Sequence, residues 1–194
     1  MKYFSLLIVF LLNLQAVQAQ NYENDSILIW NENRKLTWED FQSKTIPKKP
    51  KNSATLSPSI KFYPNELFLE NISKIRIIAI TDKNESWVDD KSYEVLNHEQ
   101  THFNITELYA RKIRKTLKDY FDKNNSYELD SIAEIYHSLE DNFWETQFEY
   151  DREIRKDWNN GKLYQKKWDK KIDSLLQVYK DYERNYTIED LEEE

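Results

Sequence analysis

The sequence of 194 residues has no cysteine, one glycine, four prolines and three histidines. Without cysteine, disulfide bonds, thiol catalysis and cysteine-ligated zinc are all excluded. A bound metal ion would therefore need histidine, aspartate or glutamate ligands. The scarcity of glycine, together with 39% hydrophobic and 14% aromatic residues, favours a packed, helix-rich domain over a disordered chain.

The chain also lacks an excess of basic residues, since its formal net charge is −7. A nucleic-acid-binding protein needs a basic surface, so we expect no nucleic-acid partner. The one dense basic stretch, residues 44–51, contains Pro47 and Pro50. It is more typical of a solvated loop than of a phosphate site.

The apolar run Phe4–Leu12 is too short to span a bilayer. It follows Lys2 and precedes the small-residue pattern Val17-Gln18-Ala19, which is the order found in secretory signal peptides. We therefore expect residues 1–19 to be a signal peptide and the mature chain to be exported. The protein would be periplasmic or secreted, with no membrane insertion after cleavage.

The segment 98–102 reads His-Glu-Gln-Thr-His, an H-E-x-x-H pattern. On a helix, residues four apart share a face, so His98 and His102 can bind one metal ion. Glu99 lies about one residue step around the helix and can reach a metal-bound water. This pattern predicts a zinc site, with Glu99 as the catalytic base.

The flanking residues predict a helix over 92–120, without glycine or proline. The alternative without a metal is an ordinary helix with two hydrogen-bonded core histidines. Two histidines at this spacing with an adjacent glutamate, all on the inward face, favour the metal site instead. The face that defines this orientation comprises Val95, His98, Glu99, His102, Thr106, Tyr109, Ile113, Leu117 and Tyr120.

Strand patterns come first in the chain and helical patterns follow. This order predicts an α+β fold, with a small N-terminal antiparallel sheet packed on three long C-terminal helices. We expect a single domain over 20–188 and an acidic tail over 189–194. The expected strands are 27–30, 59–63 and 74–80, with a helical turn at 37–41, and the second and third helices span 129–155 and 163–184.

With the motif placed, the chain resembles an exported bacterial family regarded as zinc peptidases and known only as domain of unknown function number nine hundred and twenty-two. The resemblance implies a zincin-like fold and zinc-dependent peptidase activity. It covers nearly all of the mature chain. The matching stretches are 36–41, 86–88 and 96–103, then Ile105, Glu107, Ala110 and Arg111, and finally Tyr150-Asp151 with Gln165 and Trp168.

The chain departs from the family pattern at one place that bears on the metal. In the family, a Tyr-Asp pair is followed by a Thr-x-His-Gly stretch whose histidine is the natural third ligand. Here residues 150–157 contain no histidine. Either a carboxylate replaces it, or this chain has a degenerate site with two histidines.

Asp151 is the first choice for the third ligand, because it follows Tyr150 on the inward stripe of the second helix. The competing interpretation is an ion pair between Asp151 and a lysine or arginine. Asp157 is the next alternative. Glu107 is expected to pair with Arg111 four residues later. His137 falls beside the core face, so it is a weaker candidate still. Tyr150 fits a packed aromatic better than a donor to an oxyanion.

The leading functional hypothesis is an exported zinc metallopeptidase acting on a peptide or protein substrate. The substrate would lie along the edge of the sheet formed by residues 74–80. The main alternative is a catalytically inactive zincin-like binding module of the cell envelope. Substrate, cleavage preference and oligomeric state are not indicated by the sequence.

Overall fold

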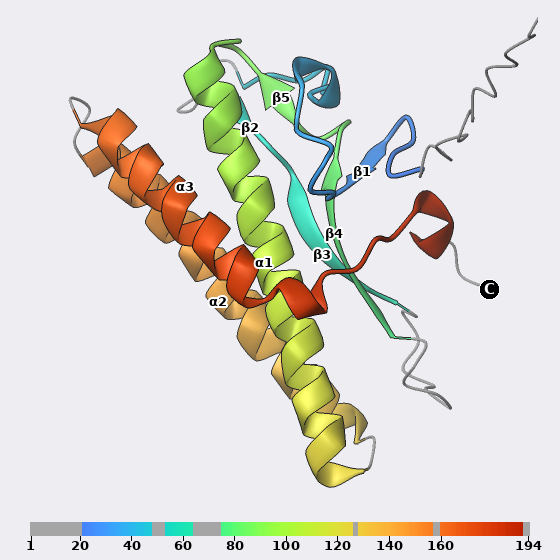
Figure 1. Cartoon of the computed structure of the whole chain (residues 1–194). Coiled ribbons are helices and arrows are strands. Elements are labelled where there is room, and N and C mark those ends of the chain that lie inside the picture. The colour runs from blue at the N-terminus through green and yellow to red at the C-terminus, as the bar shows by residue number, and fades with distance from the viewer. Residues whose placement is uncertain (1–20, 48–52, 64–74, 126–127, 157–159, 192–194) are drawn as a thin grey trace, which may run out of the picture.

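The computed structural model describes residues 21–47, 53–63, 75–125, 128–156 and 160–191. Helices pack against one side of small antiparallel sheets (Figure 1), which confirms the predicted α+β class. The expected signal peptide, Asp157 and the last three residues of the tail lie outside the described residues. No helix in the described part of the chain is long and apolar enough to cross a membrane.

The strands form two sheets. A three-stranded sheet has the order β1-β4-β3, and a two-stranded sheet pairs β2 with β5, all antiparallel. The central position of β4 corrects the expectation that residues 74–80 form a free sheet edge. The strands are β1 (Ile27–Ile29), β2 (Ala54–Thr55), β3 (Pro58–Tyr63), β4 (Arg76–Asp82) and β5 (Trp87–Val88).

Strand β4 has a continuous apolar run because other parts of the chain pack on both faces of the sheet. Alternate side chains of a strand point to opposite faces. Ile77 and Ala79 belong to the main core, whereas Ile78 and Ile80 pack with Ile188 in a smaller core on the other face. The C-terminal segment therefore covers the face of the sheet opposite the helices (Figure 1).

Three long helices supply most of the main core. Helix α1 packs on the sheet and also contacts both α2 and α3. It begins after Ser92, whose hydroxyl accepts a hydrogen bond from the backbone N–H of Val95, and ends at Asn125 in the left-handed region. The helices are α1 (Tyr93–Asn124), α2 (Leu129–Lys156) and α3 (Gly161–Val178), with short 3-10 helices η1 (Trp38–Asp40), η3 (Lys180–Tyr182) and η4 (Ile188–Leu191).

The third helix is shorter than the predicted span of 163–184. Arg111 donates to the carbonyl of Leu176, and Arg114 donates to the carbonyl of Tyr182. These two arginines of α1 satisfy carbonyl groups at and beyond the end of α3, so the chain can leave the helix and cross α1. Glu107 pairs with Arg111 at 2.9 Å, as predicted, and with Arg114 at 3.0 Å.

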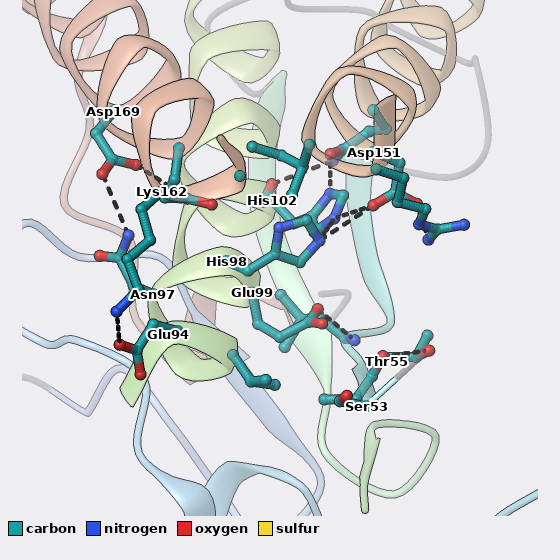
Figure 2. A pocket seen from close by; sticks show the side chains of 18 of the residues that line it. Ser53, Thr55, Glu94, Asn97, His98, Glu99, His102, Asp151, Lys162 and Asp169 are labelled. Carbon is teal, nitrogen blue, oxygen red and sulfur yellow. Dashed lines mark hydrogen bonds and ion pairs between the residues drawn. The ribbon is translucent and has the colours of Figure 1, made fainter. Parts of the chain in front are cut away.

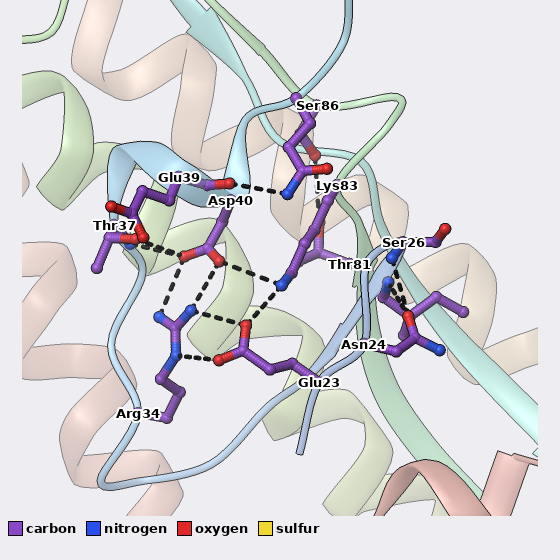
Figure 3. A network of polar contacts seen from close by, with 12 residues as sticks. Glu23, Asn24, Ser26, Arg34, Thr37, Glu39, Asp40, Thr81, Lys83 and Ser86 are labelled. Carbon is purple, nitrogen blue, oxygen red and sulfur yellow. Dashed lines mark hydrogen bonds and ion pairs between the residues drawn. The ribbon is translucent and has the colours of Figure 1, made fainter. Parts of the chain in front are cut away.

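A second polar network fixes the N-terminal segment (Figure 3). Arg34 bridges Glu23 at 3.0 Å and the buried carboxylate of Asp40 at 2.7 Å. Lys83, in the turn after β4, also reaches Glu23. Since Asp40 also accepts the backbone N–H of Thr37, the helical turn 38–40 is held against the sheet.

This N-terminal segment forms hydrogen bonds with the motif helix, α1. The backbone N–H of Leu36 donates to the side-chain oxygen of Gln100 at 2.8 Å. The indole N–H of Trp30 donates to Asn104, which Gln100 also contacts. One face of α1 is therefore anchored to residues 30–36, while His98 and His102 face α2.

Candidate metal centre

The first turns of α1 bring the two motif histidines together. Their imidazole rings are nearly perpendicular, with centroids 4.7 Å apart. The Nε2 atoms of His98 and His102 lie 3.1 Å from each other. This is the result expected from the i, i+4 spacing on an unbroken helix.

Asp151 of α2 completes a triangle with these nitrogens (Figure 2). Its Oδ1 atom lies 3.1 Å from Nε2 of His98 and 3.3 Å from Nε2 of His102. Ligands bound tetrahedrally to zinc at about 2.0–2.1 Å are separated by about 3.3 Å. The three atoms therefore match one face of such a tetrahedron, and His98, His102 and Asp151 form a group that could hold a metal ion.

The second oxygen of Asp151 makes the ion pair that was the competing interpretation. Its Oδ2 atom lies 2.9 Å from the guanidinium of Arg155, one turn further along α2. The two interpretations are compatible, because each uses a different oxygen. Arg155 holds Oδ2 and thereby turns Oδ1 toward the imidazoles.

Two other candidate ligands, Glu107 and His137, contact other side chains. Glu107 forms ion pairs with Arg111 and Arg114. The side chain of His137 is 71% exposed and lies 3.5 Å from Glu140 on the same helix. Asp157 is outside the described residues.

Gln147, which sequence reasoning missed, fixes the orientation of His102. Its side-chain nitrogen donates to the backbone carbonyl of His102, so its Oε1 atom faces Nδ1 of the imidazole at 2.6 Å. Nδ1 is then the protonated nitrogen, and Nε2 keeps a lone pair for a metal. A sequence signal existed, since Gln147 is a polar residue one turn before Asp151 on the inward face of α2.

Replacing Gln147 with leucine is expected to weaken zinc binding by about 10–100-fold, because groups that orient a ligating histidine have effects of this size. Zinc competition with a chromophoric chelator measures the change. Gln177→Leu on exposed α3 surface is the control and should bind zinc like the wild type. Unchanged affinity in Gln147→Leu would contradict the orienting role.

Tyr150 is a packed aromatic, as favoured from the sequence. Its ring stacks on His98 with centroids 4.7 Å apart and contacts His102 edge-on at 4.8 Å. Its hydroxyl points to Gln165 at 2.6 Å, and also reaches the backbone carbonyl of His98 at 3.3 Å. Burial raises the pKa of the phenol well above its ordinary value. Tyr150 therefore positions the imidazoles through its ring.

A polar network behind Tyr150 extends this support to α3. The side-chain nitrogen of Gln165 donates to Asp169 at 2.7 Å and to Thr101 at 3.0 Å. Asp169 also accepts from Asn97 at 3.2 Å. Residues on either side of His98 in α1 are thus fixed to α3, which holds the histidine in place.

The electrostatics of the triangle favour a positive charge. Burial opposes ionisation of Asp151, but the hydrogen bonds to His102 and His98 outweigh it and hold the pKa of the carboxyl well below its ordinary value. Burial likewise opposes protonation of His102, yet the hydrogen bond to Asp151 and the charge of Glu99 raise the pKa of this imidazole. A proton or a metal ion would therefore be stabilised at the same place.

Glu99 lies next to the triangle and is buried. Its Oε2 atom accepts the backbone N–H of Leu56 at 2.9 Å, which ties the segment after β2 to the motif helix. The residue also lines the cavity onto which the two histidines open. Its carboxylate is thus fixed at the cavity wall, within the electrostatic influence of His102.

The cavity has a volume of about 660 Å³. Four parts of the chain form its wall: the start of α1, the second half of α2, the start of α3 and residues 53–58 around β2. Two ion pairs lie on this wall, Glu94–Lys162 at 2.7 Å and Asp151–Arg155 at 2.9 Å. The space beside the triangle is large enough for several residues of a ligand.

No family model matches the chain, and no curated protein or solved structure matches it either. The family resemblance therefore stays a prediction from the sequence. The evidence that bears on function is the geometry of the His98, His102 and Asp151 group and of the cavity beside it.

Proposed function

We propose that the protein is an exported zinc-dependent peptidase. The observation that carries the proposal is the triangle of His98, His102 and Asp151, with ligand atoms 3.1–3.3 Å apart. The group opens on a cavity that also holds the carboxylate of Glu99. Two histidines and a carboxylate form a ligand set typical of catalytic zinc sites.

When bound, zinc would act as a Lewis acid that lowers the pKa of a water molecule and polarises a carbonyl. Glu99 would accept the proton of that water and pass it to the leaving amine. The hydrogen bond from Leu56 to Oε2 keeps the carboxylate oriented. Tyr150 takes no part in proton transfer, since its hydroxyl is directed at Gln165.

The segment around β2 is the proposed neighbour of a peptide substrate. β2 pairs with β5, and Ala54 and Thr55 line the cavity beside the metal group. An extended peptide bound in this cavity would run beside these two residues. This replaces the sequence-based placement along residues 74–80, which the central position of β4 contradicts.

A second candidate is a zincin-like binding module without catalytic activity. The observation that favours it is that both carboxylates of the site already have protein partners. Asp151 pairs with Arg155, and Glu99 accepts from Leu56. The first contact joins two turns of α2 and the second ties residue 56 to the motif helix, and both are made whether or not hydrolysis takes place.

Metal content and peptide hydrolysis, measured on the same preparation, test the proposal. We expect residues 20–194, purified without chelators, to hold about one zinc ion per chain, as a site with three ligands should. The protein should cleave members of a peptide library, lose this activity with a zinc chelator and regain it with added zinc. Failure to bind zinc at equilibrium contradicts the metal site, whereas zinc binding without cleavage favours the binding module.

A further inference from the structure

Helix α2 carries more than a metal ligand on the face that borders the cavity. Trp144, Phe148, Asp151 and Arg155 all line it. They are spaced at i, i+4, i+7 and i+11, so they form one stripe along the helix. Two aromatic side chains therefore lie on the same stripe of α2 as Asp151, the proposed metal ligand.

Trp144 and Phe148, called here the aromatic shelf, are exposed although they are large and apolar. Trp144 is 41% exposed and Phe148 is 63% exposed. The neighbouring stripe of α2, with Phe143 and Tyr150, is fully buried and already packs this helix on the core. The shelf is therefore exposed apolar surface at the rim of a cavity, which is the usual mark of a binding site.

The two rings of the shelf form a single surface. They are stacked at an interplanar angle of 29° with centroids 6.2 Å apart. Offset aromatic rings present a broad apolar area and lose little side-chain entropy when they bind a partner. Leu56 and Pro58 line the same cavity and add apolar surface to it.

Helix geometry gives the distance from the shelf to the metal site. With a rise of about 1.5 Å per residue, Phe148 lies about 4.5 Å along the axis from Asp151, and Trp144 lies about 10.5 Å from it. An extended peptide advances about 3.3 Å per residue. A peptide that lies parallel to α2, with a peptide bond at the metal site, would therefore place side chains one to three residues away over the shelf.

The charges on the cavity wall indicate which side chains fit. Glu94 is paired with Lys162, and Asp151 is paired with Arg155. An acidic substrate side chain on the shelf would lose hydration and would meet the negative faces of the aromatic rings. An apolar side chain gains from the same burial.

We propose that the aromatic shelf is the binding subsite for a large apolar side chain, aromatic or branched aliphatic, within three residues of the bond that is cleaved. The inference rests on the proposed function, because the metal site defines where that bond lies. It assigns the substrate class as peptides with a bulky hydrophobic residue near the cleavage site.

Peptide binding to the Glu99→Gln protein tests the subsite without hydrolysis. Fluorescein-labelled peptides that differ at one position, with Phe, Leu, Ala, Ser or Asp, are titrated and followed by anisotropy. The Phe and Leu peptides should bind at least about 10-fold more tightly than the Ala peptide, as is usual for hydrophobic pockets. Trp144→Ala and Phe148→Ala, each added to this background, should remove most of the difference. Val178→Ala, at an exposed residue of α3 that does not line the cavity, should retain it.

Equal affinity for the Phe and Ala peptides, an unchanged preference in both shelf variants, or binding of no peptide would each overturn the inference. Sedimentation of the same samples identifies a different occupant: a dimer that Trp144→Ala dissociates, without any peptide preference, would assign the shelf to a second copy of the chain. Zinc content separates the two proposals. A wild-type protein that binds no zinc would contradict the proposed function. A zinc-bound protein that cleaves peptides without side-chain preference would contradict only the assignment of the shelf as a subsite.

Discussion

The Glu99→Gln protein is expected to bind zinc like the wild type and to lose peptide hydrolysis. Glutamine keeps the shape of the side chain, and its oxygen can still accept the hydrogen bond from Leu56. It cannot accept the proton of a water molecule at the metal. General-base catalysis contributes about 10²–10⁴-fold to rates, so kcat should fall by about this factor.

Glu94→Gln is the matched control for this experiment, since Glu94 lies on the same helix and lines the same cavity. It is exposed and pairs with Lys162, so its loss should change kcat by less than about threefold. Thermal unfolding of both variants checks that the fold is kept. Equal cleavage by Glu99→Gln and the wild type would show that Glu99 is not the base.

Replacing either motif histidine with alanine is expected to abolish stoichiometric zinc binding. Each imidazole supplies one corner of the triangle, and a site reduced to two ligands loses most of its affinity. Elemental analysis after equilibrium dialysis measures the loss in His98→Ala, His102→Ala and the double variant. His137→Ala is the control, because this exposed histidine is on the outer surface of α2.

Retention of one zinc ion per chain in the double variant would contradict the site assignment. Asp151→Asn then separates two roles for the carboxylate. A loss of more than about 100-fold in zinc affinity indicates a ligand, whereas a loss of about 10–100-fold indicates a residue that only orients an imidazole. An affinity equal to that of the wild type would leave a site with two histidines.

The sequence by itself determined the features that depend on neighbours along the chain. Helical spacing places His98 and His102 on one face, and the structure shows their Nε2 atoms 3.1 Å apart. The pair Glu107–Arg111 follows from the same geometry. Strand patterns before helical patterns indicated the α+β class, because periodicity is a local property of each segment.

Tertiary structure decided which distant residues meet. Helical phase put Asp151 on the inward face of α2, but only the packing of α2 on α1 brought its Oδ1 atom to both imidazoles, 49 and 53 residues away in sequence. The same packing gave Gln147 its contact with His102. β4 proved central because strand order depends on long-range pairing, which the apolar run of residues 77–80 does not encode. A local pattern fixes the face on which a side chain lies, whereas its partner depends on how whole elements cross.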